Sequence, residues 1–99
     1  MASRSEVALV FKASLAKKVG EKFPFLANDA DTIQENVFGD VLYYLVDVRW
    51  FGVTCVEALK KWLVEQEESD YRVIEASYDY PTNDSGDMGG WFDNPWGLS

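Results

Sequence analysis

Residues 41–50 restrict the fold more than any other part of the chain. In this run, VLYYLVDVRW, the even positions are all apolar, and the odd positions change from apolar to charged at Asp47 and Arg49. A period of two is typical of a β-strand, because successive side chains point to opposite faces of a sheet. We therefore expect a strand with one face wholly in the core, formed by Leu42, Tyr44, Val46, Val48 and Trp50.

Two other segments predict strands. Residues 6–12 alternate Val7, Leu9 and Phe11 with other side chains, although a helix beginning at Ser5 is an alternative for the same residues. Residues 71–80 also alternate. One face would carry Arg72, Ile74, Ala76 and Tyr78, and the other Val73, Glu75, Ser77 and Asp79.

Helical spacing appears between these strands. Leu15, Val19 and Phe23 recur every fourth residue, and Pro24 is expected to end that helix. A second short helix is expected near residues 32–37. Residues 54–57, TCVE, have the form of a capping box with Thr54 as the N-cap. The helix that follows should run to about Gln66 and bury one stripe: Val56, Leu59, Trp62 and Leu63.

This order of elements predicts a single α+β domain: a small sheet of about three to four strands with two main helices packed on one face. The crossover through residues 52–70 would join strands that lie parallel. Residues 1–80 would form the compact body. Residues 81–99 would be an acidic, aromatic segment that docks on this body, adding a short strand, or extends from it.

The charge of the chain is divided unevenly along its length. It carries 17 acidic and 9 basic residues, a net charge of −8. Residues 1–63 are balanced, with eight of each sign, whereas residues 64–99 hold nine acidic residues and only Arg72. Phosphate binding needs clustered lysine and arginine, so direct nucleic-acid binding and anionic membranes are disfavoured. A protein partner with a basic surface is favoured instead.

The residue types needed for common catalytic and metal sites are missing. The sequence has no histidine, which removes the usual general base and zinc ligand, and one cysteine, which excludes an internal disulfide. Cys55 is expected to be a small buried side chain. We therefore expect no cofactor, no metal and no enzymatic activity. The short apolar runs predict neither a signal peptide nor a membrane span, so a cytoplasmic location is expected.

The candidate binding residues lie in the acidic last third. Its carboxylates are expected to form one acidic surface, and its tryptophans either plug the core or act as an exposed apolar anchor. These candidate residues are Glu75, Asp79, Asp84, Asp87, Trp91, Asp93 and Trp96.

Three blocks of the sequence carry a resemblance: RSEVA at residues 4–8, VLYYLVDVRWFG at residues 41–52 and GWFDNPWGL at residues 90–98. Together they resemble small accessory proteins of tailed bacteriophages. That resemblance implies a phage or mobile-element origin and transfers no activity. By analogy, small acidic phage proteins often antagonise host enzymes, some by imitating DNA.

Two functional hypotheses follow from these observations. In the first, the chain is an acidic binding protein that blocks a basic, nucleic-acid-binding site on a host or defence protein. In the second, it is an assembly protein whose acidic, aromatic tail docks on a sister subunit. Self-association stays open in both.

Overall fold

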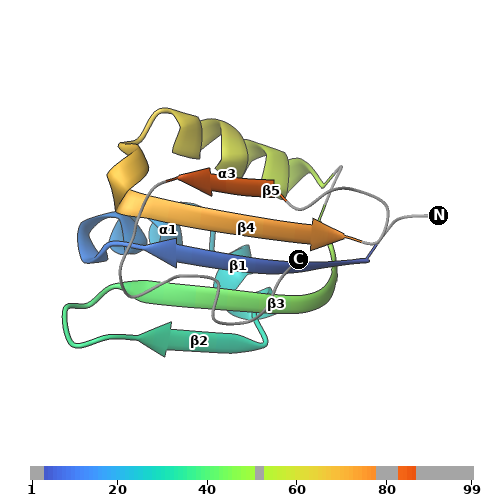
Figure 1. The fold of residues 1–99 in the computed structure, drawn as a ribbon, viewed down its shortest axis with the longest axis horizontal. Coiled ribbons are helices and arrows are strands. Elements are labelled where there is room, and N and C mark those ends of the chain that lie inside the picture. Colours follow the sequence, from blue (N-terminus) through green and yellow to red (C-terminus); the bar gives the residue numbers. More distant parts are fainter. Residues whose placement is uncertain (1–3, 51–52, 78–82, 87–99) are drawn as a thin grey trace.

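A five-stranded antiparallel sheet forms the centre of the molecule in the computed structural model, which describes residues 4–50, 53–77 and 83–86 (Figure 1). In chain order the elements are β1 (Arg4–Phe11), α1 (Ala13–Lys22), α2 (Phe25–Asp29), β2 (Thr32–Glu35), β3 (Val41–Arg49), α3 (Thr54–Val64), the 3-10 turn η1 (Glu68–Asp70), β4 (Tyr71–Ser77) and β5 (Asn83–Gly86).

The strand order is β2-β3-β1-β4-β5, and every neighbouring pair is antiparallel. Because β3 and β4 both run opposite to β1, they are parallel to each other with β1 between them, and α3 makes the crossover. In the same way, β1 and β2 both run opposite to β3, so they are parallel to each other with β3 between them. Two such split βαβ units give the ferredoxin-like arrangement, to which β5 is added beside β4. The prediction that the 52–70 crossover joins parallel strands is confirmed.

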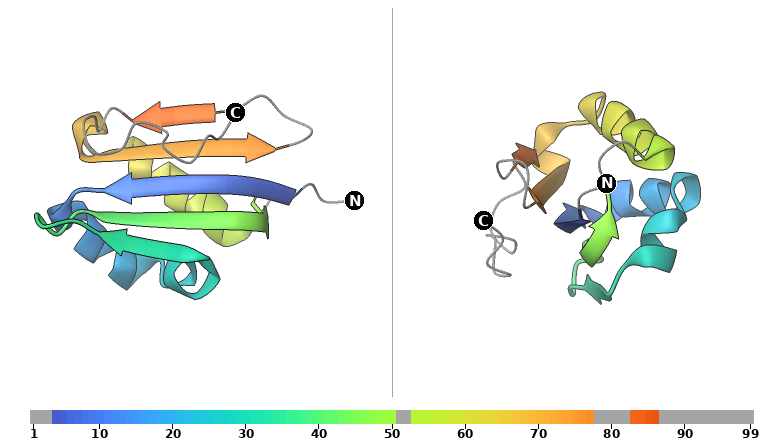
Figure 2. Two further views of the ribbon diagram at one scale, coloured as in Figure 1. Left: turned by 60° about the horizontal axis from the view of Figure 1, so that its bottom comes forward. Right: turned by 90° about the vertical axis from the view of Figure 1, so that its right-hand side faces the viewer.

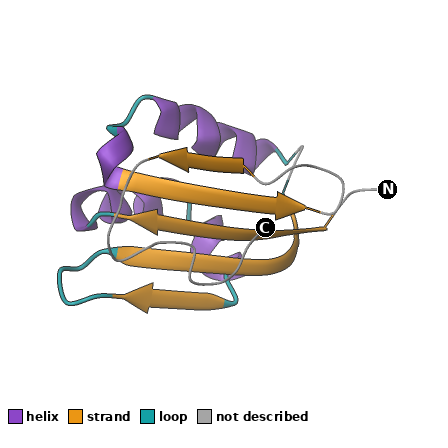
Figure 3. Ribbon diagram, in the orientation of Figure 1, coloured by secondary structure: helices purple, strands orange, loops and turns teal. Residues whose placement is uncertain are grey.

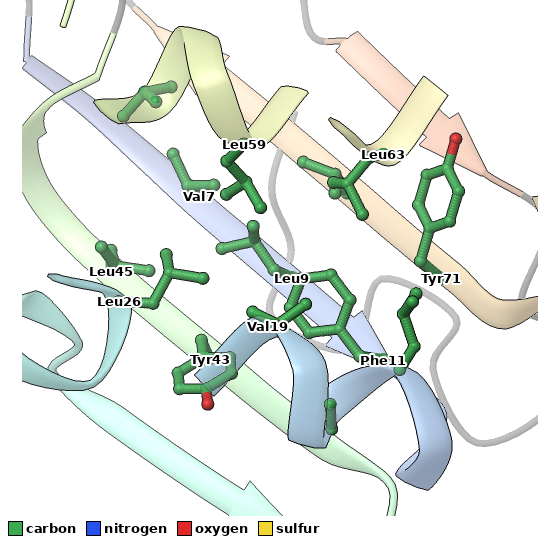
Figure 4. Close-up of a cluster of buried hydrophobic side chains, with 14 of the residues drawn as sticks. Val7, Leu9, Phe11, Val19, Leu26, Tyr43, Leu45, Leu59, Leu63 and Tyr71 are labelled. Atoms are coloured by element: carbon green, nitrogen blue, oxygen red, sulfur yellow. The ribbon is translucent and has the colours of Figure 1, made fainter. Parts of the chain in front are cut away.

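All three helices cover the same face of the sheet (Figure 2). The main core lies between the two layers, where Leu9 and Phe11 of β1 meet Val19 of α1 and Leu59 of α3 (Figure 4). The α+β class and the one-sided helix layer are therefore confirmed. The sheet is larger than predicted, because β2 and β5 extend it at its two edges.

Strand β2 replaces the helix expected near residues 32–37. Thr32 pairs with Tyr44 and Glu35 with Val41, so the segment lies along β3 as an edge strand. The short helix of this region occurs earlier, as α2, directly after Pro24. Backbone pairing with β3 and the β-branched Thr32 and Ile33 favour the extended conformation here over a helix.

Strand β3 changes face at a β-bulge. Ser5 pairs with Val48 and Val7 with Leu45, so Val46 and Asp47 both lie opposite Glu6. Asp47 has a φ of 55°, in the left-handed region. An extra residue shifts the alternation by one position.

The prediction that the even positions of β3 form one core face was wrong for this reason. Before the bulge, the odd positions Tyr43 and Leu45 face the helices, and after it Val48 and Trp50 do. Leu42 is buried on the opposite face, and Val46 is exposed.

The capping box at residues 54–57 was also wrong. Val53 is the N-cap of α3, no side chain caps it, and Thr54 is already the first helical residue. Cys55 is exposed, contrary to the expected buried side chain. The apolar stripe of this helix was correct for its three buried members, Val56, Leu59 and Leu63, while Trp62 is half-buried.

Four aromatic rings form a chain of contacts that runs from α3 to Trp50, directly after β3. Trp62 packs against Phe23 with ring centroids 5.6 Å apart, Phe23 contacts Phe25 at 6.5 Å, and Phe25 contacts Trp50 at 6.5 Å. Trp50 is 1% exposed, so its predicted burial is confirmed. The two tryptophans lie at the ends of this chain of rings.

A second, smaller apolar cluster lies on the sheet face away from the helices. Its buried members are Ala8, Val10, Leu42 and Ile74, and Tyr44 and Ala76 pack against them. No helix of the described residues covers this face (Figure 2).

Candidate protein-binding surface

Glu75, the first of the predicted site residues, does not lie on the surface. It is 1% exposed, on the helix-covered face of β4. The indole Nε1 of Trp50 donates a hydrogen bond to its Oε2, and the Lys60 Nζ lies 3.3 Å from the same oxygen. The buried carboxylate of Glu75 therefore already has a hydrogen-bond donor and a cation within the chain, and it is not available to bind another protein. The assignment of Glu75 to an exposed acidic surface was wrong.

Asp84 is exposed, but it faces the other way and its charge is already matched. It lies on β5 opposite Ile74, on the sheet face away from the helices. The Arg72 guanidinium donates to both of its carboxylate oxygens, from Nε at 3.1 Å and from Nη2 at 2.8 Å. Glu75 and Asp84 therefore do not share one surface. The other predicted site residues lie outside the described part of the chain and stay predictions: Asp79, Asp87, Trp91, Asp93 and Trp96.

Three loops that are far apart in the sequence meet at one end of the sheet. The backbone N–H of Lys12 donates to the carbonyl of Asp70 at 2.9 Å, and the N–H of Ala13 donates to Oδ1 of Asp40 at 3.0 Å. These bonds hold the start of α1 between the α3–β4 connection and the β2–β3 turn. We call this region the hairpin end, after the β2–β3 hairpin (Figure 3). It consists of residues 35–40, the start of α1 and the α3–β4 connection, residues 65–70.

The β2–β3 turn, residues 36–40, is fixed by its own hydrogen bonds. Oδ1 of Asn36 accepts from the backbone N–H groups of Phe38, at 2.9 Å, and Asp40, at 3.0 Å. Nδ2 of Asn36 donates to Oδ2 of Asp40. Gly39 has a φ of 85° and packs so closely on α1 that a Cβ there would lie 3.2 Å from the Cβ of Ala13. Glycine suits such a turn because it tolerates a positive φ, and asparagine suits it because its side chain hydrogen-bonds to the backbone of the turn.

This turn, which we call the hairpin tip, presents two apolar side chains to solvent. Val37 is 93% exposed and Phe38 is 79% exposed, and Ile33 on the adjoining edge strand is 50% exposed. Isolated exposed apolar residues are ordinary, whereas these neighbours form a small apolar patch on a fixed turn, which makes the turn a candidate interaction site.

Acidic residues are spread along the segment that carries the hairpin tip: Glu35 and Asp40 flank the tip, whereas Asp31 and Asp47 lie toward the other end of β3, where Oδ2 of Asp31 accepts from the backbone N–H of Val46. Residues 23–48, which include α2, β2 and all of β3 except its last residue, Arg49, contain no lysine or arginine. The same residues include five acidic side chains: Asp29, Asp31, Glu35, Asp40 and Asp47. The even balance over residues 1–63 concealed this run, because the compensating lysines belong mainly to α1 and α3. Counting charge by structural element rather than by half of the chain would have found it.

A second group of carboxylates lies between α3 and β4. Glu65, Glu67 and Glu68 are exposed and, among the described residues, form no ion pair. Asp70 differs, because the Lys12 Nζ lies 3.6 Å from its Oδ1. Burial, and secondarily the charge of Glu68, raises the pKa of Tyr71 above its usual range. The hairpin end thus combines the acidic α3–β4 connection with an apolar tip that Glu35 directly precedes.

The described residues of the sheet face away from the helices do not form a nucleic-acid platform. RNA-binding sheets present exposed aromatic rings among basic side chains. Here Tyr44 is half-buried and its hydroxyl donates to Oε2 of Glu6 at 3.2 Å, while Arg72 is paired with Asp84. Burial, followed by the charge of Glu6, raises the pKa of Tyr44. Among the described residues of this face, Glu6 adds an exposed carboxylate that would repel phosphate.

Within residues 4–50, 53–77 and 83–86, no three acidic, cysteine or histidine side chains come together as metal ligands. None of the described helices is long and apolar enough to cross a membrane. No known protein family, curated protein or solved structure matches the chain.

Proposed function

We propose that this chain is a non-enzymatic acidic binding protein, encoded by a phage or mobile element, that occupies a basic, nucleic-acid-binding site on a host or defence protein. The observation that carries the proposal is the group of exposed carboxylates at the hairpin end without cationic partners among the described residues: Glu35, Glu65, Glu67 and Glu68. These four carboxylates, in place of Glu75 and Asp84, form the centre of the proposed acidic surface.

Countercharge is the physical basis of this function. Nucleic-acid-binding sites are lined with lysine and arginine that release counterions when phosphates bind. A rigid array of carboxylates competes for the same side chains, and its attraction adds chiefly to the association rate. The net charge of −8 supplies long-range steering toward such a site.

The first experiment is capture from bacterial lysate at low salt after nuclease treatment, followed by reconstitution with the purified captured protein. We expect that protein to bind duplex DNA or RNA and this chain to displace the nucleic acid. The association rate should fall at least about tenfold between low and physiological salt, as expected for a steered encounter. A captured partner that holds its nucleic acid undisturbed would contradict the proposal.

Matched charge variants make this test specific. Glu67→Lys with Glu68→Lys reverses charge at the hairpin end, and Glu21→Lys with Glu57→Lys makes the same change in net charge on the helix layer. All four positions are exposed. The first pair should slow association much more than the second. Equal effects would mean that only net charge matters and that the hairpin end is not the interface.

A further inference from the structure

The hairpin tip has the physical properties of a preformed binding anchor. The hydrogen bonds of Asn36 fix the backbone that carries Val37 and Phe38, so little backbone conformational entropy remains to be lost on binding. Both side chains are more than three-quarters exposed. Burial of a rigidly held aromatic side chain in a partner pocket is a common source of interface hot spots.

The fold does not need these side chains. Val37 and Phe38 belong to neither buried apolar cluster, whose members come from the sheet and the helices. A turn of this geometry is satisfied by Asn36, Gly39 and Asp40, and polar residues would serve at the two positions between Asn36 and Gly39.

Charge limits what can receive the tip. The two carboxylates that flank the tip, the exposed Glu35 and the turn residue Asp40, favour a pocket with a basic rim. A second copy of this chain would bring a further −8, and an anionic membrane would repel the same carboxylates.

We propose that Val37 and Phe38 form the apolar anchor of a protein interface and insert into an apolar pocket rimmed by basic side chains on the partner. This inference rests on the proposed function for the basic character of the partner. The anchoring role itself rests on exposure and turn geometry.

The test uses the full-length protein with a photo-crosslinking phenylalanine analogue at position 38, expressed in a bacterial cytosol and irradiated. The matched control carries the analogue at Val64, which is 80% exposed on α3. We expect position 38 to give a crosslink to one partner protein and position 64 to give none. No adduct from position 38, or the same adducts from both positions, would overturn the proposal.

Binding of the crosslinked protein, once purified, separates anchoring from folding. Val37→Ser with Phe38→Ser should leave the melting temperature unchanged and raise the dissociation rate about 30-fold, the effect of losing one hot spot. Val64→Ser should change neither quantity. An unchanged dissociation rate for the tip variant would overturn the anchoring role.

Two other outcomes would also overturn the proposal. A crosslink between two copies of this chain would make the tip a self-association contact. Sedimentation of the wild-type protein, but not the tip variant, with phosphatidylcholine–phosphatidylglycerol vesicles would make it a lipid contact. The proposed function fails separately: if a single partner crosslinks at the tip but binds independently of salt and binds no nucleic acid, the anchor stands and the DNA-site hypothesis falls.

Discussion

Trp50→Phe tests whether the buried Trp50–Glu75 hydrogen bond contributes to stability. The substitution keeps an aromatic ring in the core but removes the N–H that Oε2 of Glu75 accepts. Glu75 is 1% exposed, so water cannot replace the lost donor without opening the core. A hydrogen bond to a charged group contributes about 1.5–3 kcal/mol. The smaller ring loses about 1 kcal/mol of apolar burial.

We therefore expect Trp50→Phe to lower the free energy of unfolding by about 2.5–4 kcal/mol. Lys60 remains 3.3 Å from the carboxylate and keeps the loss toward the lower end of that range. For a domain of this length, the melting temperature should fall by about 10–30 °C. Urea denaturation followed by circular dichroism measures the free energy directly.

Trp62→Phe is the matched control, because it makes the same change in the half-buried ring that packs on Phe23, where no hydrogen bond to the indole N–H occurs among the described residues. It should cost about 1 kcal/mol or less. In a Glu75→Leu background, Trp50→Phe should also cost only about that packing contribution, since the acceptor is gone. Equal losses for Trp50→Phe and Trp62→Phe would refute the reasoning.

Three further predictions concern other parts of the molecule. Gly86→Ala should lower the free energy of unfolding by more than about 2 kcal/mol, because the φ of Gly86 is +86° and an added Cβ would collide with the carbonyl oxygen of Tyr71. Gly20→Ala, where nothing lies within 4 Å of an added Cβ, should instead raise the free energy of unfolding by up to about 1 kcal/mol in the same urea titration. Burial chiefly raises the pKa of Tyr43, Tyr44 and Tyr71, so the folded state holds these protons more tightly than the unfolded chain. Their contribution to stability is complete below about pH 10 and is lost as the pH rises above it, and Tyr44→Phe should reduce that loss in denaturation curves measured across the alkaline range. The sequence-based prediction that Trp91 and Trp96 plug the core is tested by deletion of residues 87–99, which should then lower the melting temperature and increase binding of an apolar dye; an unchanged melting temperature would show that the two tryptophans are dispensable to the fold.

The sequence predicted those elements whose signal is local. Alternation at Val7, Leu9 and Phe11 and the four-residue spacing of Leu15 and Val19 correspond to real core contacts. The position of α1 and its end before Pro24 also followed from local chemistry.

Errors arose where pairing between distant segments decided the structure. The bulge at Val46 and Asp47 depends on which residue of β1 lies opposite, and one extra residue reverses every face that follows it. Residues 32–35 form a strand because β3 offers an edge, which their own sequence does not reveal. Thr54 matched a capping box, but the helix begins one residue too early for it to cap.

The same limit applies to the candidate site. Alternation alone put Glu75 and Asp79 on one face of the strand expected over residues 71–80, but it could not say which face the helices cover. Once α3 lies over that face, Glu75 becomes a core residue held by Trp50 and Lys60.

The position of the acidic surface follows from where the fold places its cations. Lys60 reaches Glu75, Lys12 reaches Asp70 and Arg72 reaches Asp84, so three of the basic side chains are engaged in ion pairs inside or beside the sheet. Glu35, Glu65, Glu67 and Glu68 have no such partner among the described residues. Glu35 ends β2 directly before the hairpin tip, and the other three lie in the α3–β4 connection at the same end of the sheet (Figure 3). Solubility alone would account for the carboxylates but not for the exposed Val37 and Phe38 at the same end of the sheet, and these two apolar side chains are the reason for proposing an interface there.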